Sequence, residues 1–375
     1  MQFPTTNIQT LTVEPNRRIL AVSDIHGYGG LLRKLLEQAH FCPEDLLVIV
    51  GDIVEKGPES LTTLRYVMEL CKQGNAIALI GNVDAGRMEM IETLSEDNAE
   101  KFYRYLLSLR VWVGTSFYDE LAMECGYEIE SAADVLRAKE AIIRHFQPEF
   151  SFLASLPTIV ETQNYVFVHG GLREREVAAN LSCGLFELTK YDAFMTKTPH
   201  TFDKYLVVGH WPVALYDGDK QQLNPIVNRE KKIIAIDGCC GVQKECQLNL
   251  LVIPAIDCAI DEVSHLHADA FPRIRALESQ EESENPVHIF WTDREIKMLE
   301  RGDEVSLVEH VSSGRKVHVP NVYLKSDTEC HNYTSYVLPV EAGETLALIR
   351  TVGERCMVKK NGVVGWYGGA YEEIR

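Results

Sequence analysis

The sequence lacks any apolar run long enough to cross a bilayer as a helix, which takes about 18 to 20 residues. Its first residues, MQFPTTNIQTLTVEPNRRILAV, also lack the apolar core of a secretory signal peptide. These two absences exclude the usual sequence signals for membrane insertion and for export. We therefore expect a cytoplasmic protein that does not associate with membranes.

Cysteine pairs with the spacing of metal ligands are absent too. The chain has ten cysteines, but none stands in a Cys-x-x-Cys pair, and only Cys239 and Cys240 are close neighbours. Without an export signal, such scattered thiols are expected to stay reduced and mostly to fill the core. The sequence therefore predicts neither a disulfide framework nor a cysteine-based zinc site.

Positive charge is scarce. Lys and Arg total 37 against 55 Asp and Glu, which gives a formal net charge of −18. An acidic surface repels the phosphate backbone of DNA and RNA, so we expect no nucleic-acid partner. The argument applies to the surface alone, because a bound cation reverses the local charge inside a pocket.

What the sequence does contain is 375 residues with 46% hydrophobic content, enough for two domains. Near the N-terminus, short apolar runs alternate with amphipathic helical patterns. Continuous apolar strands with helical crossovers are typical of an α/β domain whose strands are buried and largely parallel. The three apolar runs are RILAV at 18–22, LLVIVGD at 46–52 and AIALIGN at 76–82.

The rest of the chain divides into regions of different pattern. From about 85 to 152, apolar residues recur at helical spacing, which predicts a helical insertion in a first domain of residues 1–260. Residues 261–286 become acidic and poor in apolar residues, which predicts a helix running into an exposed linker. Residues 287–375 contain short strand patterns between Gly and Asn turns, which predict a small antiparallel β-barrel or sandwich.

Polar side chains stand directly after five predicted strands of the first domain. Because strand ends meet at one edge of an α/β sheet, we expect these side chains to lie together. The set combines two carboxylates, three imidazoles and one amide oxygen, which suits Mn, Fe or Zn better than Ca or Mg. The six candidate metal ligands are Asp24, His26, Asp52, Asn82, His169 and His210.

The motifs that carry these residues resemble a known family. DIHG, GD-x4-G, GN-x-D, HGG and GH occur in the order found in calcineurin-like metallophosphoesterases. HGG, GHWP and IDGCCG are most similar to the serine/threonine phosphoprotein phosphatase branch. The stretch GDIVEKGPESLTTLRYV also resembles the symmetrical diadenosine tetraphosphatases. The resemblance covers roughly residues 17–255 and implies a layered β-sandwich flanked by helices.

The resemblance also implies a role for each candidate ligand. Asp24 and His26 would hold one metal, and Asp52 would bridge it to a second. The implied ligands of the second metal are Asn82, His169 and His210. We expect two divalent cations, with manganese preferred over iron and zinc. A hydroxide bridging them would attack phosphorus in line with the leaving oxygen, which requires no covalent nucleophile.

Three positions depart from the phosphatase pattern. Val83 stands where that branch has a histidine that assists the leaving group, and Glu55 replaces the aspartate that orients this histidine. Lys56 replaces a phosphate-binding arginine and keeps its charge without its bidentate fork. Losing a general acid costs about 10²–10⁴ in rate, and less when the leaving group is a weak base.

Acidic groups near this gap are the candidate catalytic residues. Glu55 is one, although it has no histidine at position 83 to orient. Asp84 is the other: it serves either as the remaining acid or as the cap of the helix that follows. His145 and His200, from other parts of the chain, are further candidates for the missing acid.

The candidate substrate-binding residues are basic. Lys56, Arg87 and Arg173 are assigned this role because cationic side chains near these loops can bind phosphate. Arg175, in the charged run RERE, is expected to be exposed instead. Asp237 either fixes the tautomer of a ligand histidine or caps a turn.

The C-terminal strands resemble bacterial SH3-like modules, chiefly through ETLALIRTVGERCMVKKNGVVGWYGG. Trp366, Tyr367 and Tyr371 either form a platform for a peptide or glycan or pack inside the protein. Under the first alternative this domain has a peptide or protein partner.

Three functions stay open at this point. The first is a metal-dependent phosphoric ester hydrolase similar to a protein serine/threonine phosphatase, acting on a phosphorylated protein or a small phosphate ester. The second is a nucleotide phosphoanhydride or phosphodiester hydrolase, favoured by Val83 and by GDIVEKGP. The third is a catalytically weak, phosphate-dependent binding module. It ranks last, because a degenerate enzyme should lose metal ligands first and all six are present.

Overall fold

The computed structural model describes residues 2–374, which fold as two compact units. The first unit comprises the chain up to Pro212 together with Pro225–Asp269. The second comprises Val213–Asn224 and the chain from Ala270 onward. The chain therefore leaves the first unit two residues beyond His210, contributes a short segment to the second unit, and returns.

The first unit contains a sheet in which two strands, β2 (Ile19–Val22) and β3 (Leu46–Ile49), are buried along their whole length. In spatial order its strands are β12 (Ser264–Ala268), β11 (Leu248–Ile253), β2, β3 and β4 (Ala76–Ala78). β2, β3 and β4 pair in parallel, whereas β11 is antiparallel to both of its neighbours. The first two apolar runs seen in the sequence thus form the predicted buried, parallel strands, and the third forms the parallel strand β4, in which Ala78 is buried.

A second sheet packs on the first. In spatial order it contains β1 (Ile8–Thr10), β5 (Ile159–Glu161), β6 (Tyr165–Val168), β7 (Tyr205–Val208), β10 (Ile233–Ala235) and β9 (Ile226–Asn228). One buried cluster joins side chains of both sheets, among them Val48 from the first and Phe167 and Ile234 from the second. The core therefore lies between two sheets, and this unit is the layered α/β sandwich expected from the sequence.

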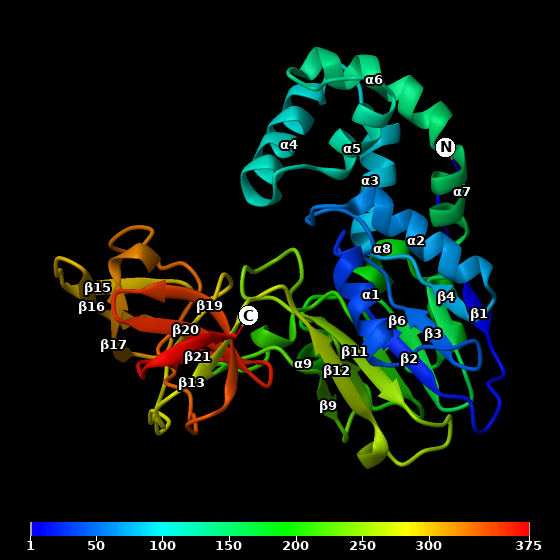
Figure 1. Ribbon diagram of the computed structural model, residues 1–375. Helices are drawn as coiled ribbons and strands as arrows, with labels where there is room; N and C mark the ends of the chain where they lie inside the picture. The colour runs from blue at the N-terminus through cyan, green and yellow to red at the C-terminus, as the bar shows by residue number, and fades with distance from the viewer. Residues whose placement is uncertain (1, 375) are drawn as a thin grey trace. The chain divides into compact units, whose positions relative to one another are not determined.

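Helices cover the outer face of the first sheet. α1 (Gly29–Gln38) contacts β12, and α2 (Ser60–Lys72) contacts β4. Figure 1 shows both helices on the side of the sheet that faces away from β6. Each helix follows a strand of the sheet directly, so the loops between them lie at one edge.

Residues 82–155 are helical where the sequence predicts a helical insertion. The helices are α3 (Asn82–Glu92), α4 (Ala99–Val113), α5 (Phe117–Glu124), α6 (Ala132–His145) and α7 (Gln147–Ser155), and α4 to α6 stand away from the sheets (Figure 1). α3 begins at Asn82 itself, so the insertion grows directly out of a candidate metal loop. Within residues 2–374, no helix has the length and apolar character needed to span a membrane.

The helix predicted within residues 261–286 is wrong. That segment contains a short 3-10 turn at Ile260–Glu262, then β12, then β13 (Arg273–Ala276). β12 completes the edge of the first sheet by pairing with β11, which the local pattern of charges did not reveal. Pro272 stands just before β13 and cannot sit inside a continuing helix. Tertiary pairing therefore overrides the local pattern here.

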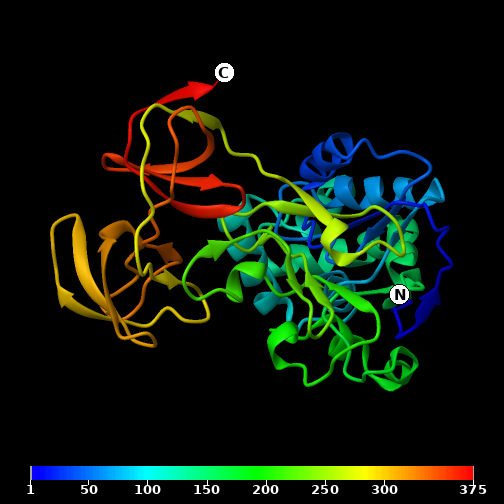
Figure 2. The same ribbon diagram turned by 90° about the horizontal axis from the view of Figure 1, so that it is seen from below.

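The second unit is built from strands. Its largest sheet has the order β22 (Tyr371–Ile374), β13, β19 (Thr345–Val352), β20 (Arg355–Lys360), β21 (Val363–Tyr367) and β8 (Gln221–Gln222). A separate sheet contains β15 (Ile296–Glu300), β16 (Val305–His310) and β17 (Arg315–Pro320), and Figure 2 shows it apart from β19–β21. Short β14 (His288–Ile289) pairs with β18 (Tyr333–Thr334). An all-β C-terminal region agrees with the sequence analysis.

The aromatic residues near the C-terminus pack inside this unit. Trp366 is 4% exposed and Tyr367 is fully buried, and the indole N–H of Trp366 donates to the Thr334 carbonyl. Tyr371 packs against the same apolar cluster as Tyr367. The platform alternative is therefore wrong for Trp366 and Tyr367, which lack the exposed ring faces that a peptide or glycan would contact.

Candidate active site

The candidate ligands occupy the loops that follow five strands of the first unit. Asp24 and His26 follow β2, and Asp52 follows β3. Asn82 follows β4 after a short connection, and the remaining two, His169 and His210, follow β6 and β7 directly. Because β2, β3 and β4 are parallel, as are β6 and β7, these loops leave their sheets at the same ends. The structure thereby brings distant parts of the chain together.

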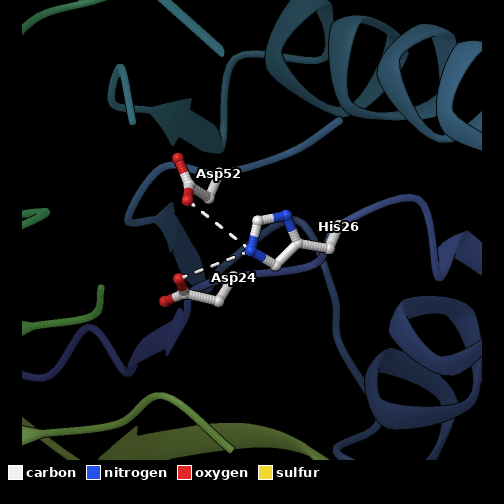
Figure 3. Close-up of side chains that lie close together, drawn as sticks. All are labelled: Asp24, His26 and Asp52. Carbon is white, nitrogen blue, oxygen red and sulfur yellow. Dashed lines mark ion pairs between the residues drawn. The ribbon is translucent and has the colours of Figure 1, made fainter. Parts of the chain in front are cut away.

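Asp24, His26 and Asp52 form the first cluster (Figure 3). One ligand atom from each lies within 4.8 Å of the others, and all three residues are buried. His26 Nε2 is 3.9 Å from Asp24 Oδ1 and 3.5 Å from Asp52 Oδ2. The other ring nitrogen of His26, Nδ1, is 3.2 Å from the Val54 carbonyl, to which it donates, leaving Nε2 as a lone-pair donor for a metal.

His169 stands on the other side of Asp52. Its Nε2 is 3.4 Å from Asp52 Oδ2, the oxygen that also faces His26. Its Nδ1 lies 2.7 Å from the Val50 carbonyl and donates to it, which directs the Nε2 lone pair into the site. One carboxylate oxygen of Asp52 is therefore shared between two imidazoles, as a ligand that bridges two cations requires.

Asn82 completes a second group of donors. Its side-chain oxygen lies 3.1 Å from His169 Nε2 and 2.9 Å from His210 Nδ1. The Thr189 carbonyl oxygen is a further 3.1 Å neighbour of the same position. Once His169 Nε2 has given up its proton, all of these atoms can accept and none donates, so a cation among them is favourable. Turning the amide over would place its NH₂ there instead and satisfy the same acceptors. The donor set therefore fits a second divalent cation.

The outer partner of His210 is Asp192, which the sequence analysis missed. His210 Nε2 lies 2.8 Å from Asp192 Oδ1, so the carboxylate fixes the tautomer that exposes Nδ1 to the site. Asp237, the predicted candidate for such a role, instead accepts from the Cys239 backbone N–H at 2.8 Å. The turn-capping alternative therefore describes Asp237. Asp192 carried no signal, because it lies outside the strand-end loops.

Four of the six candidate ligands have left-handed backbone conformations. The φ angles are 53° for Asp24, 46° for His26, 54° for Asp52 and 63° for His210. Such conformations cost of order 1–3 kcal/mol each for residues other than glycine, and they persist where surrounding contacts impose them. Here the Asp24 and His26 N–H groups donate to the carbonyls of Gly51 and Asp52, which ties the first two loops together.

Glycines at the strand ends allow the loops to approach one another closely. A Cβ on Gly81 would lie 2.1 Å from both the backbone nitrogen and the Oδ1 of Asp52. A Cβ on Gly209 would lie 2.4 Å from Asp24 Oδ2. The glycines of the GN and GH motifs are thus required by space, because any side chain would push the ligand carboxylates out of place.

The buried charges set the protonation of the ligands. Burial raises the pKa of Asp24 to about 6, and it lowers the pKa of His26 to about 3 and that of His210 to about 4. Burial disfavours charge on Asp52 and His169 as well, but their mutual attraction prevails. The pKa of Asp52 is lowered, and that of His169 is raised to about 10. A cation bound at His169 Nε2 would displace its proton.

Val83 and Asp84 lie in the first turn of α3, and both form hydrogen bonds with the loop that carries Asp52. The Val83 N–H donates to Asp52 Oδ1 at 2.8 Å. The Asp84 carboxylate is fully buried and accepts from the N–H groups of Gly81, Ile53 and Val54. Burial, with Asp52 nearby, raises the pKa of Asp84 to about 7. Three backbone donors engage this carboxylate, so the geometry favours the helix-capping alternative over a catalytic acid.

Glu55 has a partner other than a histidine. It is 1% exposed, and its Oε2 accepts from Arg87 Nε at 2.6 Å. Its Oε1 accepts from the Phe117 N–H, at the start of α5. Beside it, Lys56 Nζ lies 3.2 Å from His26 Nε2, so the lysine reaches the first cluster of ligands. Two predicted substrate-binding residues, Lys56 and Arg87, thus flank Glu55.

The remaining candidates lie in other surroundings. Arg173 donates from Nε to the Glu187 carbonyl, and its guanidinium stacks 3.8 Å from the centre of the Tyr191 ring. His200 Nε2 is 3.1 Å from the Arg173 carbonyl, and half-exposed His145 lies 3.4 Å from Glu124 of α5. Neither histidine contacts a candidate ligand through a described hydrogen bond. Arg175 pairs with exposed Asp203, consistent with a surface position.

One protein family and several known proteins are similar to this chain in sequence. The family described as Calcineurin-like phosphoesterase matches residues 17–236, more than half of the 375-residue chain. Serine/threonine-protein phosphatase 2 of Escherichia coli (strain K12) is 41% identical over 92 residues, which cover 24% of this chain and 40% of that protein. The symmetrical bis(5'-nucleosyl)-tetraphosphatase of Pseudomonas entomophila (strain L48) is 46% identical over 65 residues, 17% of this chain and 22% of that protein.

The chain thus spans less than half the length of the curated relatives it matches. A protein serine/threonine phosphatase structure from Saccharomyces cerevisiae is 14% identical with a TM-score of 0.44, covering 72% of this chain and 85% of that chain. The two sequence relatives represent both branches named from the motifs. The chain belongs to the calcineurin-like phosphoesterase family.

Proposed function

We propose that the protein is a two-metal hydrolase of phosphate monoesters, similar to a protein serine/threonine phosphatase. The observation that carries this proposal is the position of Asp52 Oδ2, 3.5 Å from His26 Nε2 and 3.4 Å from His169 Nε2. A carboxylate shared in this way is suited to bridge two cations. Manganese is the proposed metal, with iron and zinc as alternatives, because the donors mix imidazole, carboxylate and amide.

The chain's own residues then have distinct roles. Asp24, His26 and Asp52 would hold one cation, and Asp52 would also bind a second. The other ligands of the second cation would be Asn82, His169 and His210. When bound, such cations activate a water molecule and neutralise charge on phosphate oxygens. Lys56, next to His26, would bind a phosphate oxygen as a point charge. Val83 supplies no proton to the leaving group.

A second candidate is hydrolysis of a nucleotide phosphoanhydride or phosphodiester. Val83 favours it, because phosphate and nucleotide leaving groups depart without a proton more readily than an alkoxide does. The similarity to symmetrical bis(5'-nucleosyl)-tetraphosphatases points the same way. The third candidate, a catalytically weak binding module, is least supported, because both clusters of ligand donors are complete.

We also propose that the C-terminal unit is an SH3-like module that binds a peptide segment of a partner protein. Its short strands and tight turns are the support for this assignment. Because Trp366 and Tyr367 are buried, the binding surface would have to use other side chains. The expected result is that full-length protein carrying Asp52→Asn loses hydrolysis but keeps peptide binding, because Asp52 belongs to the first unit.

One substrate panel separates the three candidates. Manganese-loaded protein is incubated with a phosphoserine peptide, a phosphotyrosine peptide, diadenosine tetraphosphate, a nucleoside diphosphate and an aryl phosphodiester, and released phosphate or nucleotide is measured. We expect turnover of the phosphopeptides, with phosphotyrosine ahead of phosphoserine. Turnover of diadenosine tetraphosphate alone would favour the second candidate. No turnover of any compound, with metal bound, would exclude both hydrolases.

A further inference from the structure

The Glu55–Arg87 pair links a candidate metal loop to the helical insertion. Glu55 stands three residues after Asp52 and is 1% exposed. Arg87, on α3, donates from Nε to Glu55 Oε2 at 2.6 Å, and the side chain of Arg87 is 15% exposed. A carboxylate this deeply buried needs a cationic partner, and Arg87 provides it.

Arg87 lies on the same face of α3 as Val83. Residues four apart on a helix are neighbours, with Cβ atoms about 5–6 Å apart. The Val83 N–H is bound to Asp52 Oδ1, so the start of this helix is fixed against the site. The guanidinium therefore stands one helical turn from the position at which the phosphatase pattern places its leaving-group histidine.

The guanidinium is held by two further contacts. Arg87 Nη2 donates to the Tyr105 hydroxyl of α4 at 2.5 Å, and Nη1 donates to Met90 Sδ at 2.9 Å. An arginine side chain has five N–H donors, and the described contacts of Arg87 use three of them, which leaves two. These two N–H groups are on a planar fork suited to binding a phosphate or ester oxygen.

We propose that Arg87 binds the departing oxygen of the substrate and that Glu55 and Tyr105 position it there. This inference rests on the proposed hydrolase function and narrows its substrate class. In the step, the bond from water oxygen to phosphorus forms while the bond from phosphorus to the leaving oxygen breaks. The electron pair stays on the leaving oxygen, which departs as an anion beside the guanidinium and takes its proton from solvent.

The favoured substrates follow from this arrangement. An arginine stabilises negative charge but does not give up a proton; this is sufficient for aryl oxides and phosphate anions, which can depart unprotonated, but not for alkoxides, which need a proton to depart. We therefore assign the site to phosphotyrosine-like monoesters and phosphoanhydrides rather than to phosphoserine. A merely structural ion pair predicts no such dependence on the leaving group.

The same insertion offers a matched control for the structural alternative. Arg110 of α4 makes a bidentate pair with Asp119 of α5 and also donates to the Ile129 carbonyl. Like Glu55–Arg87, this ion pair joins a helix of the insertion to another segment of the chain, but it has no described contact with a metal loop. Substitutions at Arg110 therefore measure the effect on activity of losing an ion pair within the insertion alone.

The experiment measures kcat/KM of manganese-loaded protein on a graded series of aryl phosphates and on a phosphoserine peptide. The variants are R87Q, R87K, E55Q, R110Q and R110K, each checked for manganese content and thermal unfolding. We expect R87Q to lose about 10²-fold on phenyl phosphate and clearly less on 4-nitrophenyl phosphate, whose oxide needs less stabilisation. R87K keeps the ion pair without the fork, and it should lose about 10-fold with the same trend.

Each outcome decides the matter. E55Q should follow the leaving-group trend of R87Q, whereas R110Q and R110K should change all substrates by the same small factor. If R87Q does not fold, the trend in R87K carries the test. Equal losses on every ester in the folded Arg87 variants would overturn the inference while leaving the hydrolase proposal intact. An inactive wild-type protein with manganese bound would overturn both.

Discussion

The loop after β3 serves two sides of the candidate site that are built differently. On one side, Asp52 faces His26 and His169, and every candidate ligand keeps the residue type that a metal requires. On the other side, Glu55 faces Arg87 of the helical insertion, and no histidine stands between them. Only two residues separate Asp52 from Glu55 in the chain.

The difference between the two sides shows which residues of such a site can be replaced by other residue types. A metal ligand must meet several demands at once: a lone pair in the right direction, for histidine a fixed tautomer and, at four of the six candidates here, a left-handed backbone. The side that faces the leaving group needs only a favourable charge, which a side chain from another element can supply. Arg87 reaches Glu55 from α3, so this side can be rebuilt without moving a metal ligand.

The largest expected effect tests the metal side. Asp52→Asn removes the charge of the oxygen shared by two imidazoles, so two cations can no longer be held together. Lewis-acid stabilisation is worth several kcal/mol, and we expect kcat/KM on an aryl phosphate to fall at least about 10³-fold. The measurement is steady-state hydrolysis together with the number of manganese ions bound per chain.

Asp45→Asn is the control for that change. Asp45 is also a buried carboxylate, but it pairs with Arg18 and caps Cys42 away from the candidate ligands. This variant should lose thermal stability and keep its bound manganese. If Asp52→Asn retained near wild-type rates, the bridging role would be refuted, and with it the contrast between the two sides.

An intermediate effect is expected one step outside the metal side. Asp192→Ala removes the carboxylate that holds His210 Nε2, and loss of such a partner weakens metal binding by about 10–100-fold. Because Asp192 is 49% exposed, we expect a value near the lower end. Calorimetric titration of metal-free protein with manganese should show one site weakened and the other unchanged.

Asp203→Ala is the matched control for Asp192. Asp203 is also an exposed aspartate of the first unit, and it pairs with Arg175 at the surface. Its removal should leave both manganese affinities unchanged. A similar weakening in both variants would mean that net surface charge, rather than the hold on His210, sets the affinity.

Much of this arrangement could be predicted from the sequence, because it is local. Apolar runs that end in Gly-Asp, Gly-Asn or His-Gly-Gly mark strand ends, and parallel strands carry their ends to one edge. The candidate ligands Asp24, His26 and Asp52 therefore come together as expected, although their roles as metal ligands stay a prediction. The helical spacing of residues 85–152 likewise indicated an insertion of helices.

The rest depends on contacts between distant elements, which no local pattern records. Asp192 meets His210 across 18 residues, and Arg87 meets Glu55 across 32. The sequence around Asp84 fitted both a helix cap and a catalytic acid. Only the three backbone N–H groups that donate to its carboxylate distinguish the two roles. The helix predicted within residues 261–286 failed because β12 pairs with β11, a contact that the charge pattern of the segment itself does not record.

The smallest expected effect tests the leaving-group side, and it is the most informative. Val83→His restores a proton donor, and a general acid is typically worth about 10²–10⁴ in rate. Here Glu55 is already engaged by Arg87, so the new imidazole has no carboxylate to orient it. We expect a gain below about 10-fold on a phosphoserine peptide and none on an aryl phosphate, as these leaving groups differ in their need for a proton.

Adding Arg87→Gln to Val83→His should remove the reason why Val83→His alone gives only a small gain in rate. The second change leaves the Glu55 carboxylate without its cation, a loss that costs about 3–5 kcal/mol for a buried pair. A protonated histidine at position 83 can then take over as the partner of Glu55. The gain from Val83→His on the phosphoserine peptide should therefore be larger in the Arg87→Gln background than in the wild type, a coupling that a double-mutant cycle measures directly. Independent effects of the two substitutions would show that Glu55 and Arg87 do not act on the leaving group together. Equal gains in rate on alkyl and aryl esters would contradict the proposal that Arg87 and position 83 act on the leaving group.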